Sequence, residues 1–154
     1  MAAILFGAAV VLLGVRVAIN FAHPPSDQDL IQQALTASLD ASRKGQAGGV
    51  LDLLSKQIKV NQSSAPDNSE IADFIRRFKP DIQLEDRHAL ITGDEARIVT
   101  PVDLGLLGQT ARLKDVTLVF HKEQGHGFLY LPTPQWHLTE VRLAESQLPN
   151  LTGP

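Results

Sequence analysis

The chain of 154 residues contains no cysteine, which excludes disulfide bonds, thiolate metal ligands and a cysteine nucleophile. Aromatic residues are scarce, at 5% of the chain, with one tryptophan and one tyrosine. There is no excess of positive charge either, because 14 Lys and Arg stand against 17 Asp and Glu, for a net charge of −3. A chain without a basic surface is not expected to bind nucleic acid.

Charge is almost absent from the first 22 residues, where Arg16 is the only charged side chain. The apolar run from Ala2 to Ala22 has the length of about twenty residues that a helix needs to cross a bilayer. We therefore expect residues 1–22 to be a membrane anchor. The alternatives are a signal peptide, with residues 2–15 as its apolar region, and a buried helix of a soluble domain. Near the end of a membrane span, Arg16 can reach the headgroups or a polar site on a neighbouring protein, so we predict that it contacts a partner.

The residues after this run indicate its orientation and the division of the chain. After Ala22 the first charges are Asp27, Asp29 and Asp40, and no further cation appears until Arg43 and Lys44. Because cytoplasmic flanks favour Lys and Arg, we expect the amino terminus inside and the domain in the periplasm or its equivalent. About 130 residues suffice for one domain. The predicted division is an anchor over 1–22, a linker over 23–27, a domain over 28–145 and a tail over 146–154.

Two helices and a strand are expected first. Ser26 with Asp29 three positions later indicates a capping box, and Gly45 with the following Gly48–Gly49 pair is expected to end the helix. Apolar and small residues recur along it at helical spacing: Leu30, Ile31, Ala34, Leu35, Ser38 and Leu39. A short helix over 50–54 and a strand over 57–61 are expected to follow.

The next segment predicts a third helix, with Asn68 or Ser69 as its cap and Pro80 as its stop. Its apolar stripe, which we interpret as core, comprises Ile71, Phe74, Ile75 and Phe78. From Asp81 onward the period changes from 3.6 to 2, which indicates a curved antiparallel sheet. Strands are expected over 82–91, 95–107, 110–122 and 135–143, with a long connection over 123–134.

This order of elements resembles the nuclear-transport-factor-2-like superfamily, which includes ketosteroid isomerases and SnoaL-like cyclases. The resemblance covers residues 26–143 and rests on the helical stripes over 30–39 and 71–78, the strand over 95–103 and the last strand over 136–141. It implies an α+β fold in which a cone-shaped, curved antiparallel sheet wraps around helices, as in a cystatin-like α+β barrel. It also implies a cavity inside the cone and pairing of two domains through the sheet.

The resemblance supplies no catalytic residue. Isomerases of this superfamily use a carboxylate base and an oxyanion site that includes a tyrosine, but Tyr130 falls in the last connection. On neighbouring strands, His88 and Asp103 could supply a base and its partner inside the cavity, with Trp136 closing it. These three residues are the pocket candidates. For Asp103, an ion pair with Arg97 or Arg112 is the alternative.

The last connection carries two further candidate sets. His121, His126 and His137 flank it, but their spacing matches no known ligand set, so we favour surface histidines and expect neither metal nor cofactor. An apolar stretch between Gly127 and Pro132 is the candidate partner contact, and it consists of Phe128, Leu129, Tyr130 and Leu131. Folding of this stretch over the mouth of the cone is the alternative.

No coherent catalytic set is present. We therefore predict a non-catalytic accessory subunit with a single membrane span, which stabilises or assembles a larger membrane protein complex together with the other subunits. Bacterial photosynthetic or respiratory complexes are suggested as hosts by analogy alone. The alternative is a small-ligand-binding protein, or an isomerase-like or cyclase-like enzyme, that uses the cavity of the cone.

Overall fold

The computed structural model describes residues 24–126 and 132–144. The first helix, α2 (Asp27–Lys44), begins with the predicted capping box, because the Asp29 N–H donates to Ser26 Oγ and the Ser26 N–H donates to the Asp29 carboxylate. It ends at Gly45, whose φ of 72° lies in the left-handed region that glycine adopts at little cost. Both predicted ends of this helix are confirmed.

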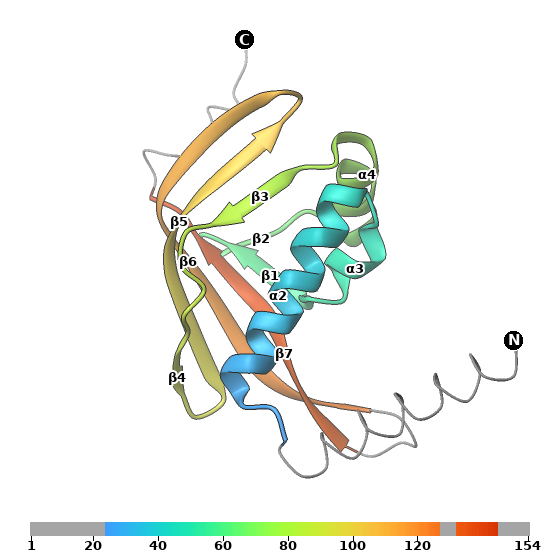
Figure 1. The fold of residues 1–154 in the computed structure, drawn as a ribbon. Helices are drawn as coiled ribbons and strands as arrows, with labels where there is room; N and C mark the ends of the chain where they lie inside the picture. The colour runs from blue at the N-terminus through green and yellow to red at the C-terminus, as the bar shows by residue number, and fades with distance from the viewer. Residues whose placement is uncertain (1–23, 127–131, 145–154) are drawn as a thin grey trace, which may run out of the picture.

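The strands form one curved sheet in the order β2-β1-β7-β6-β5-β3, with β4 pairing on β5. Neighbours are antiparallel except for β1 and β7, which are parallel. Figure 1 shows α2 lying across the hollow side of this sheet, with the two other helices beside it. The strands are β1 (Leu54–Val60), β2 (Ser63–Ser64), β3 (Asp81–Leu84), β4 (Leu90–Thr92), β5 (Glu95–Leu106), β6 (Gln109–His126) and β7 (Pro132–Arg142).

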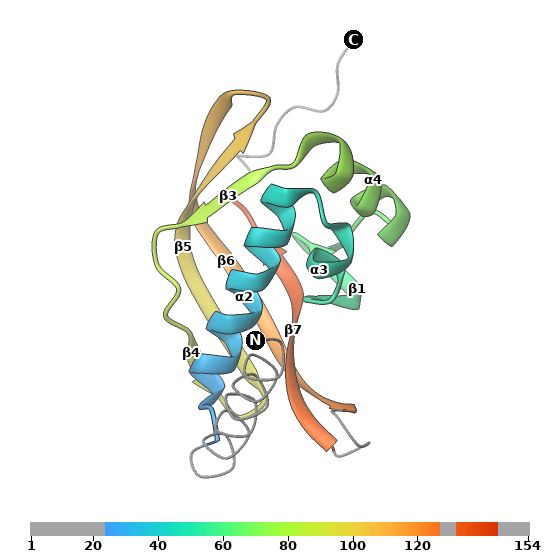
Figure 2. The same ribbon diagram turned by 45° about the vertical axis from the view of Figure 1, so that its right-hand side comes forward.

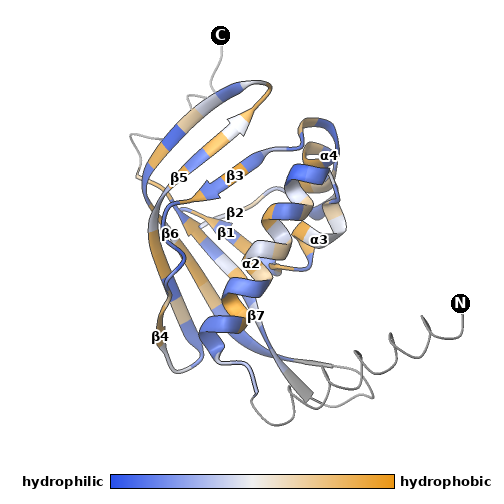
Figure 3. Cartoon of the chain, viewed as in Figure 1, coloured by the Kyte–Doolittle hydropathy of each residue, from blue (hydrophilic) through white to orange (hydrophobic). Residues whose placement is uncertain are grey.

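Buried and exposed residues alternate along the long strands, as the period of 2 predicted, and the buried ones form the core. On β5 the buried residues are Ala96, Ile98, Thr100 and Val102, and on β6 they include Val116, Leu118 and Phe120. Ile31 and Leu35 of α2 pack against this face together with Trp136 and Leu138 of β7. Figure 3 shows that α2 carries both hydrophilic and hydrophobic residues along its length. The buried side chains fill the hollow of the cone.

The prediction of a single strand over 82–91 is wrong. This segment forms two strands, β3 and β4, which are joined by residues 85–89. In this connection the Asp86 N–H donates to Thr100 Oγ1 at 2.8 Å. The Asp86 carboxylate accepts from the His88 N–H, also at 2.8 Å. These side chains take up backbone groups that a continuous ladder would have used.

The third predicted helix, α4 (Asn68–Phe78), is present, but its cap is Asp67 and not Asn68 or Ser69. Asp67 Oδ1 accepts from the N–H groups of Ser69 and Glu70 at 2.8 and 2.9 Å. The apolar stripe is core only in part. Ile75 is buried in a small separate cluster with α3 (Ala47–Leu51), whereas Phe74 is 42% exposed. Since α4 packs on α3 beside the cone, its aromatic rings do not enter the main core.

The bounds predicted for the long connection, 123–134, are wrong at both ends. Strand β6 continues to His126, and β7 already begins at Pro132. Proline is compatible with a strand where its missing N–H faces no partner strand. The Leu138 N–H donates to Leu53 O, on the side of β7 opposite to β6. Since alternate residues turn their backbone groups to the same side, the nitrogens of Pro132 and Pro134 also face away from β6.

No helix within 24–126 or 132–144 is both long and apolar enough to cross a bilayer. The predicted anchor over 1–22, the apolar stretch over 128–131 and the predicted tail over 146–154 lie outside the described residues.

We expect Phe120→Ala to lower the free energy of unfolding by about 3–5 kcal/mol, because the ring is fully buried between α2 and the sheet. Urea unfolding of the full chain measures this loss. Val99→Ala is the matched control on β5, since Val99 is 58% exposed on the outer face, and it should change stability by less than about 0.5 kcal/mol. Equal effects of the two substitutions would contradict the packing described above.

Candidate functional site

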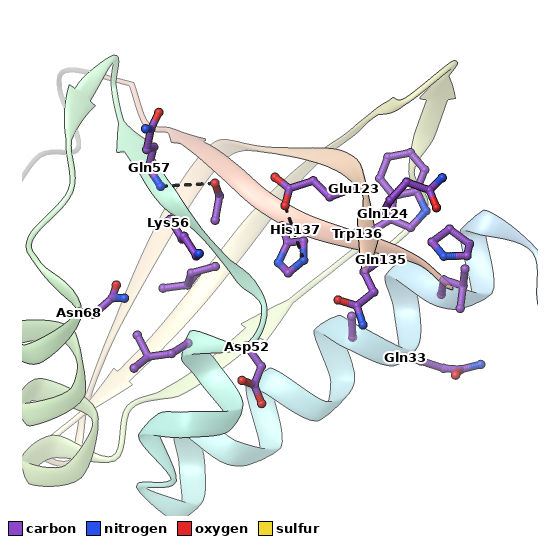
Figure 4. Close-up of a pocket in the computed structure, with 16 residues that line it drawn as sticks. Gln33, Asp52, Lys56, Gln57, Asn68, Glu123, Gln124, Gln135, Trp136 and His137 are labelled. Carbon is purple, nitrogen blue, oxygen red and sulfur yellow. Dashed lines mark hydrogen bonds and ion pairs between the residues drawn. The ribbon is translucent and has the colours of Figure 1, made fainter. Parts of the chain in front are cut away.

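The described residues leave a groove open at the side of the cone. Phe120 and Trp136 are buried on the concave face of the sheet, at 0% and 4% exposure, where the resemblance had implied a cavity. A groove of about 1070 Å³ instead opens to solvent between α2 and strands β1 and β7. Figure 4 shows the groove bounded by α2, the α3–β1 connection and the first half of β7.

The register of the sheet explains why the groove exists. Strand β1 pairs with β7 only from Leu54 opposite Leu138, and before Leu54 the chain leads back to α3. Residues 132–137 of β7 therefore extend beyond the start of β1, with β6 on one side and the groove on the other. The ladder is irregular between Leu54 and Lys59 as well, and such bulges bend a strand and widen the space beside it.

The groove combines an apolar inner wall with polar sides. The apolar side chains that line it belong to Leu30, Ala34, Leu51, Leu54 and Trp136. The polar ones include Gln33 on α2, Asp52 after α3, Lys56 and Gln57 on β1, and Glu123, Gln135 and His137 on β6 and β7. Such a lining suits a ligand with one apolar and one polar side, and its openness suits a macromolecular partner better than an enclosed metabolite.

A charged cluster holds Trp136 in the wall of the groove. The indole Nε1 donates to Asp27 Oδ1 at 3.1 Å, and Lys122 Nζ lies 2.9 Å from the same carboxylate. Lys122 also lies 5.7 Å from the centre of the Trp136 ring, within cation–π range. The hydrogen bond from Lys122 lowers the pKa of Asp27, and the indole hydrogen bond adds to this against the opposing effect of desolvation. The cluster thus fixes the first turn of α2 to strands β6 and β7.

We expect Asp27→Asn to lower the free energy of unfolding by about 1 kcal/mol at pH 7. The substitution removes the charge opposite Lys122 but keeps an oxygen for the indole. The pKa of Asp27 is lower in the folded chain than its ordinary 3.8, so the stabilisation is present above about pH 4 and is lost as the pH falls through the folded-state pKa.

Urea unfolding between pH 2 and pH 7 measures this difference. The gap between the wild type and Asp27→Asn should close at the lowest pH, where the wild-type carboxyl is itself protonated. Asp40→Asn, on the exposed side of the same helix, is the control. A gap that stays constant across this range would show that the charge of Asp27 has no part in the effect.

The pocket candidates have separate partners. His88 is exposed in the β3–β4 connection, where its N–H donates to Asp86. Asp103 lies on β5, 3.2 Å from Arg112 Nη1, which is the ion pair foreseen as the alternative. Arg112 also pairs with Glu85. Of the three candidates, Trp136 alone lines the groove.

The histidines lie on the hairpin of β6 and β7. His121 and His137 are paired across the two strands. Their imidazoles lie 3.5 Å from Glu95 and 4.0 Å from Glu123 respectively. Within the described ranges no three such side chains form a group that could hold a metal ion. The side chain of His126 lies outside the described part, as do Arg16 and the stretch over 128–131.

The outer face of the sheet carries an ion pair that the sequence analysis missed. Glu140 Oε2 accepts from Arg142 Nη2 at 2.7 Å. This hydrogen bond lowers the pKa of Glu140, with smaller contributions from the charges of Arg142 and Lys59. Glu140 Oε1 is buried without a hydrogen-bond partner among the described residues. The spacing of two along β7 was the available signal, because it places both side chains on one face.

The groove itself was also missed. Its walls come from segments far apart in the chain, and each segment alone resembles an ordinary amphipathic element. The usable signal was the pair Pro132 and Pro134 beside an alternating strand, which is typical of a strand with one free edge.

Comparison with protein-family models and with curated proteins gives no match. Among solved structures, a nuclear-transport-factor-2-like protein of unknown function from Shewanella oneidensis is similar, with a TM-score of 0.54 and 17% identity over 76% of this chain and 98% of that one. Another from Rhodospirillum rubrum, described as of unknown function in nutrient uptake, has a TM-score of 0.54 and 15% identity over 77% and 98%. A candidate ketosteroid isomerase from Shewanella frigidimarina has a TM-score of 0.50 and 15% identity over 73% and 92%. At these identities the similarity establishes the nuclear-transport-factor-2-like fold of the domain, and it extends no further.

Proposed function

We propose that this chain is a non-catalytic accessory subunit, which residues 1–22 tether to the membrane and which binds a partner protein of a larger membrane complex in the groove beside β7. The observation that carries the proposal is the position of the open space. Phe120 and Trp136 fill the cone, whereas the groove at its side is wide, open and lined by both apolar and polar side chains.

The titratable groups with shifted pKa values support a structural role over catalysis. The pKa values of Asp29 and Asp67 are lowered by the hydrogen bonds that they accept at the helix starts. Those of Asp27 and Glu140 are lowered by Lys122 and Arg142. A catalytic base would instead face a pocket that admits its substrate. None of these four carboxylates therefore supports the alternative, an isomerase-like or cyclase-like enzyme that uses the cone.

The tether belongs to the proposal on the strength of the sequence. Ala2 to Ala22 has the length and apolarity of a span, and Arg16 is a charge that favours a polar partner within or beside the membrane. Asp27 contacts Lys122 and Trp136, so the chain enters the domain in contact with β6 and β7. Figure 2 shows the start of α2 at the same end of the sheet as the start of β7. A partner at the membrane would thus meet the anchor and the β6–β7 end together, including the proposed contact over 128–131.

Pairing of two domains through the sheet stays a prediction. The outer face exposes Val99 and Leu90, which are apolar side chains of the kind that a second domain could cover.

Purification of the tagged full-length chain from its own host in mild detergent tests the proposal. We expect mass spectrometry to find the intact chain, residues 1–22 included, together with companions that span the membrane at a constant ratio. Recovery as a lone fragment without these residues would contradict the tether and the accessory role together.

Arg16→Leu tests the anchor as a partner contact. We expect the companions to fall by about tenfold or more relative to the tagged chain, since the proposed polar contact would lose its charge on this side. Arg16→Lys keeps the charge and is the matched control. Unchanged recovery with Leu at position 16 would reduce residues 1–22 to a tether without a specific contact.

A further inference from the structure

The edge of β7 that borders the groove has a free backbone. Over residues 132–137 the described chain places β6 on one side of β7 and no strand on the other. The ladder with the α3–β1 segment stops at the hydrogen bond from the Leu138 N–H to Leu53 O. An unpaired edge beside a groove is a template for another extended chain.

The backbone groups on this edge follow from that last hydrogen bond. The Leu138 N–H points into the groove side, and alternate residues point the same way. Trp136 therefore presents its N–H and its C=O there, and Pro134 and Pro132 present carbonyls only. The edge is rich in acceptors and has a single N–H donor within 132–137.

The excess of carbonyl acceptors over N–H donors on this edge determines which kind of strand can pair with it. Two copies of the edge would bring carbonyls against carbonyls, because the same prolines would remove the donors from both strands. An ordinary peptide segment without proline supplies one N–H per residue and complements the edge. The edge therefore favours a partner strand over pairing with its own copy.

The residues that line the groove indicate which side chains a bound segment should carry. The lining includes Leu30 and Ala34 of α2, and Figure 4 shows Glu123 and His137 close together on the strands that face this helix. Side chains of a strand alternate between two faces. A strand that continues the line of β1 would turn every second side chain toward α2 and the intervening ones toward Glu123 and His137.

We propose that an extended segment of the partner protein, about four to six residues long, with alternating apolar and polar side chains and no proline, adds to the free edge of β7 as a further strand. This inference rests on the proposed function, because it specifies how the groove holds its partner. At about 3.3 Å per residue, such a segment matches the length of residues 132–137.

A displayed library of random linear hexapeptides, selected on the full-length chain in mild detergent, provides the probe. The best peptide is then synthesised with a methyl group on one backbone nitrogen at a time. We expect methylation to weaken binding by about fivefold to tenfold at every second position and to have little effect at the others. If methylation weakens binding without alternating along the peptide, or does not affect binding at any position, strand addition is overturned.

Hydrogen exchange supplies a second readout in the chain itself. The bound peptide should slow exchange of the Trp136 amide and leave the amides of Gln135 and His137 unchanged, because those two face β6. Ala34→Phe, which fills the groove from α2, should abolish peptide binding. Ala37→Phe, on the exposed side of the same helix, should bind as the wild type does. Thermal melting checks that both variants are folded.

The failures of the two proposals are distinguishable. If no peptide is enriched on the wild type over Ala34→Phe, strand addition is wrong, whereas recovered membrane companions would still support the accessory role. If Ala34→Phe and Ala37→Phe bind the peptide equally, the peptide lies elsewhere and the inference is also overturned.

Discussion

Apolar packing between α2 and the concave face of the sheet is the constraint on which the rest of the structure depends. Ile31 and Phe120 are fully buried in it, and Trp136 completes it from β7. Because this packing occupies the cone, the wide groove lies at its side, where the sheet and the helix diverge. The divergence occurs where β1 stops pairing with β7. The geometry that stabilises the domain thus also determines where a partner can bind.

Local patterns predicted the elements that depend on local interactions. The capping box of Ser26 and Asp29, the stop at Gly45 and the buried alternation of β5 and β6 were all confirmed. Predictions failed where a distant group intervened. The Thr100 side chain accepts a hydrogen bond from the Asp86 N–H, which lies in the connection that separates β3 from β4. Pro132 and Pro134 fit within β7 because their nitrogens face away from β6, and this depends on the neighbours of the strand.

The candidate site was less predictable than the fold. His88 and Asp103 were chosen for their chemistry, yet each lies among partners near its own strand. Trp136 was chosen as a residue that closes a cavity inside the cone, and it lines a groove that lies beside the cone. The groove depends on how β1, β7 and α2 meet, and none of these segments carries that information in its own periodicity.

The Asp27 cluster also has a mechanical consequence. Any pull on the chain before residue 24 reaches the domain at the first turn of α2, where Asp27 binds Lys122 and Trp136. These two contacts connect the start of α2 to β6 and to β7, which pair with each other along the hairpin. The point where the chain enters the fold is thus coupled, through Trp136, to the strand that forms a wall of the groove.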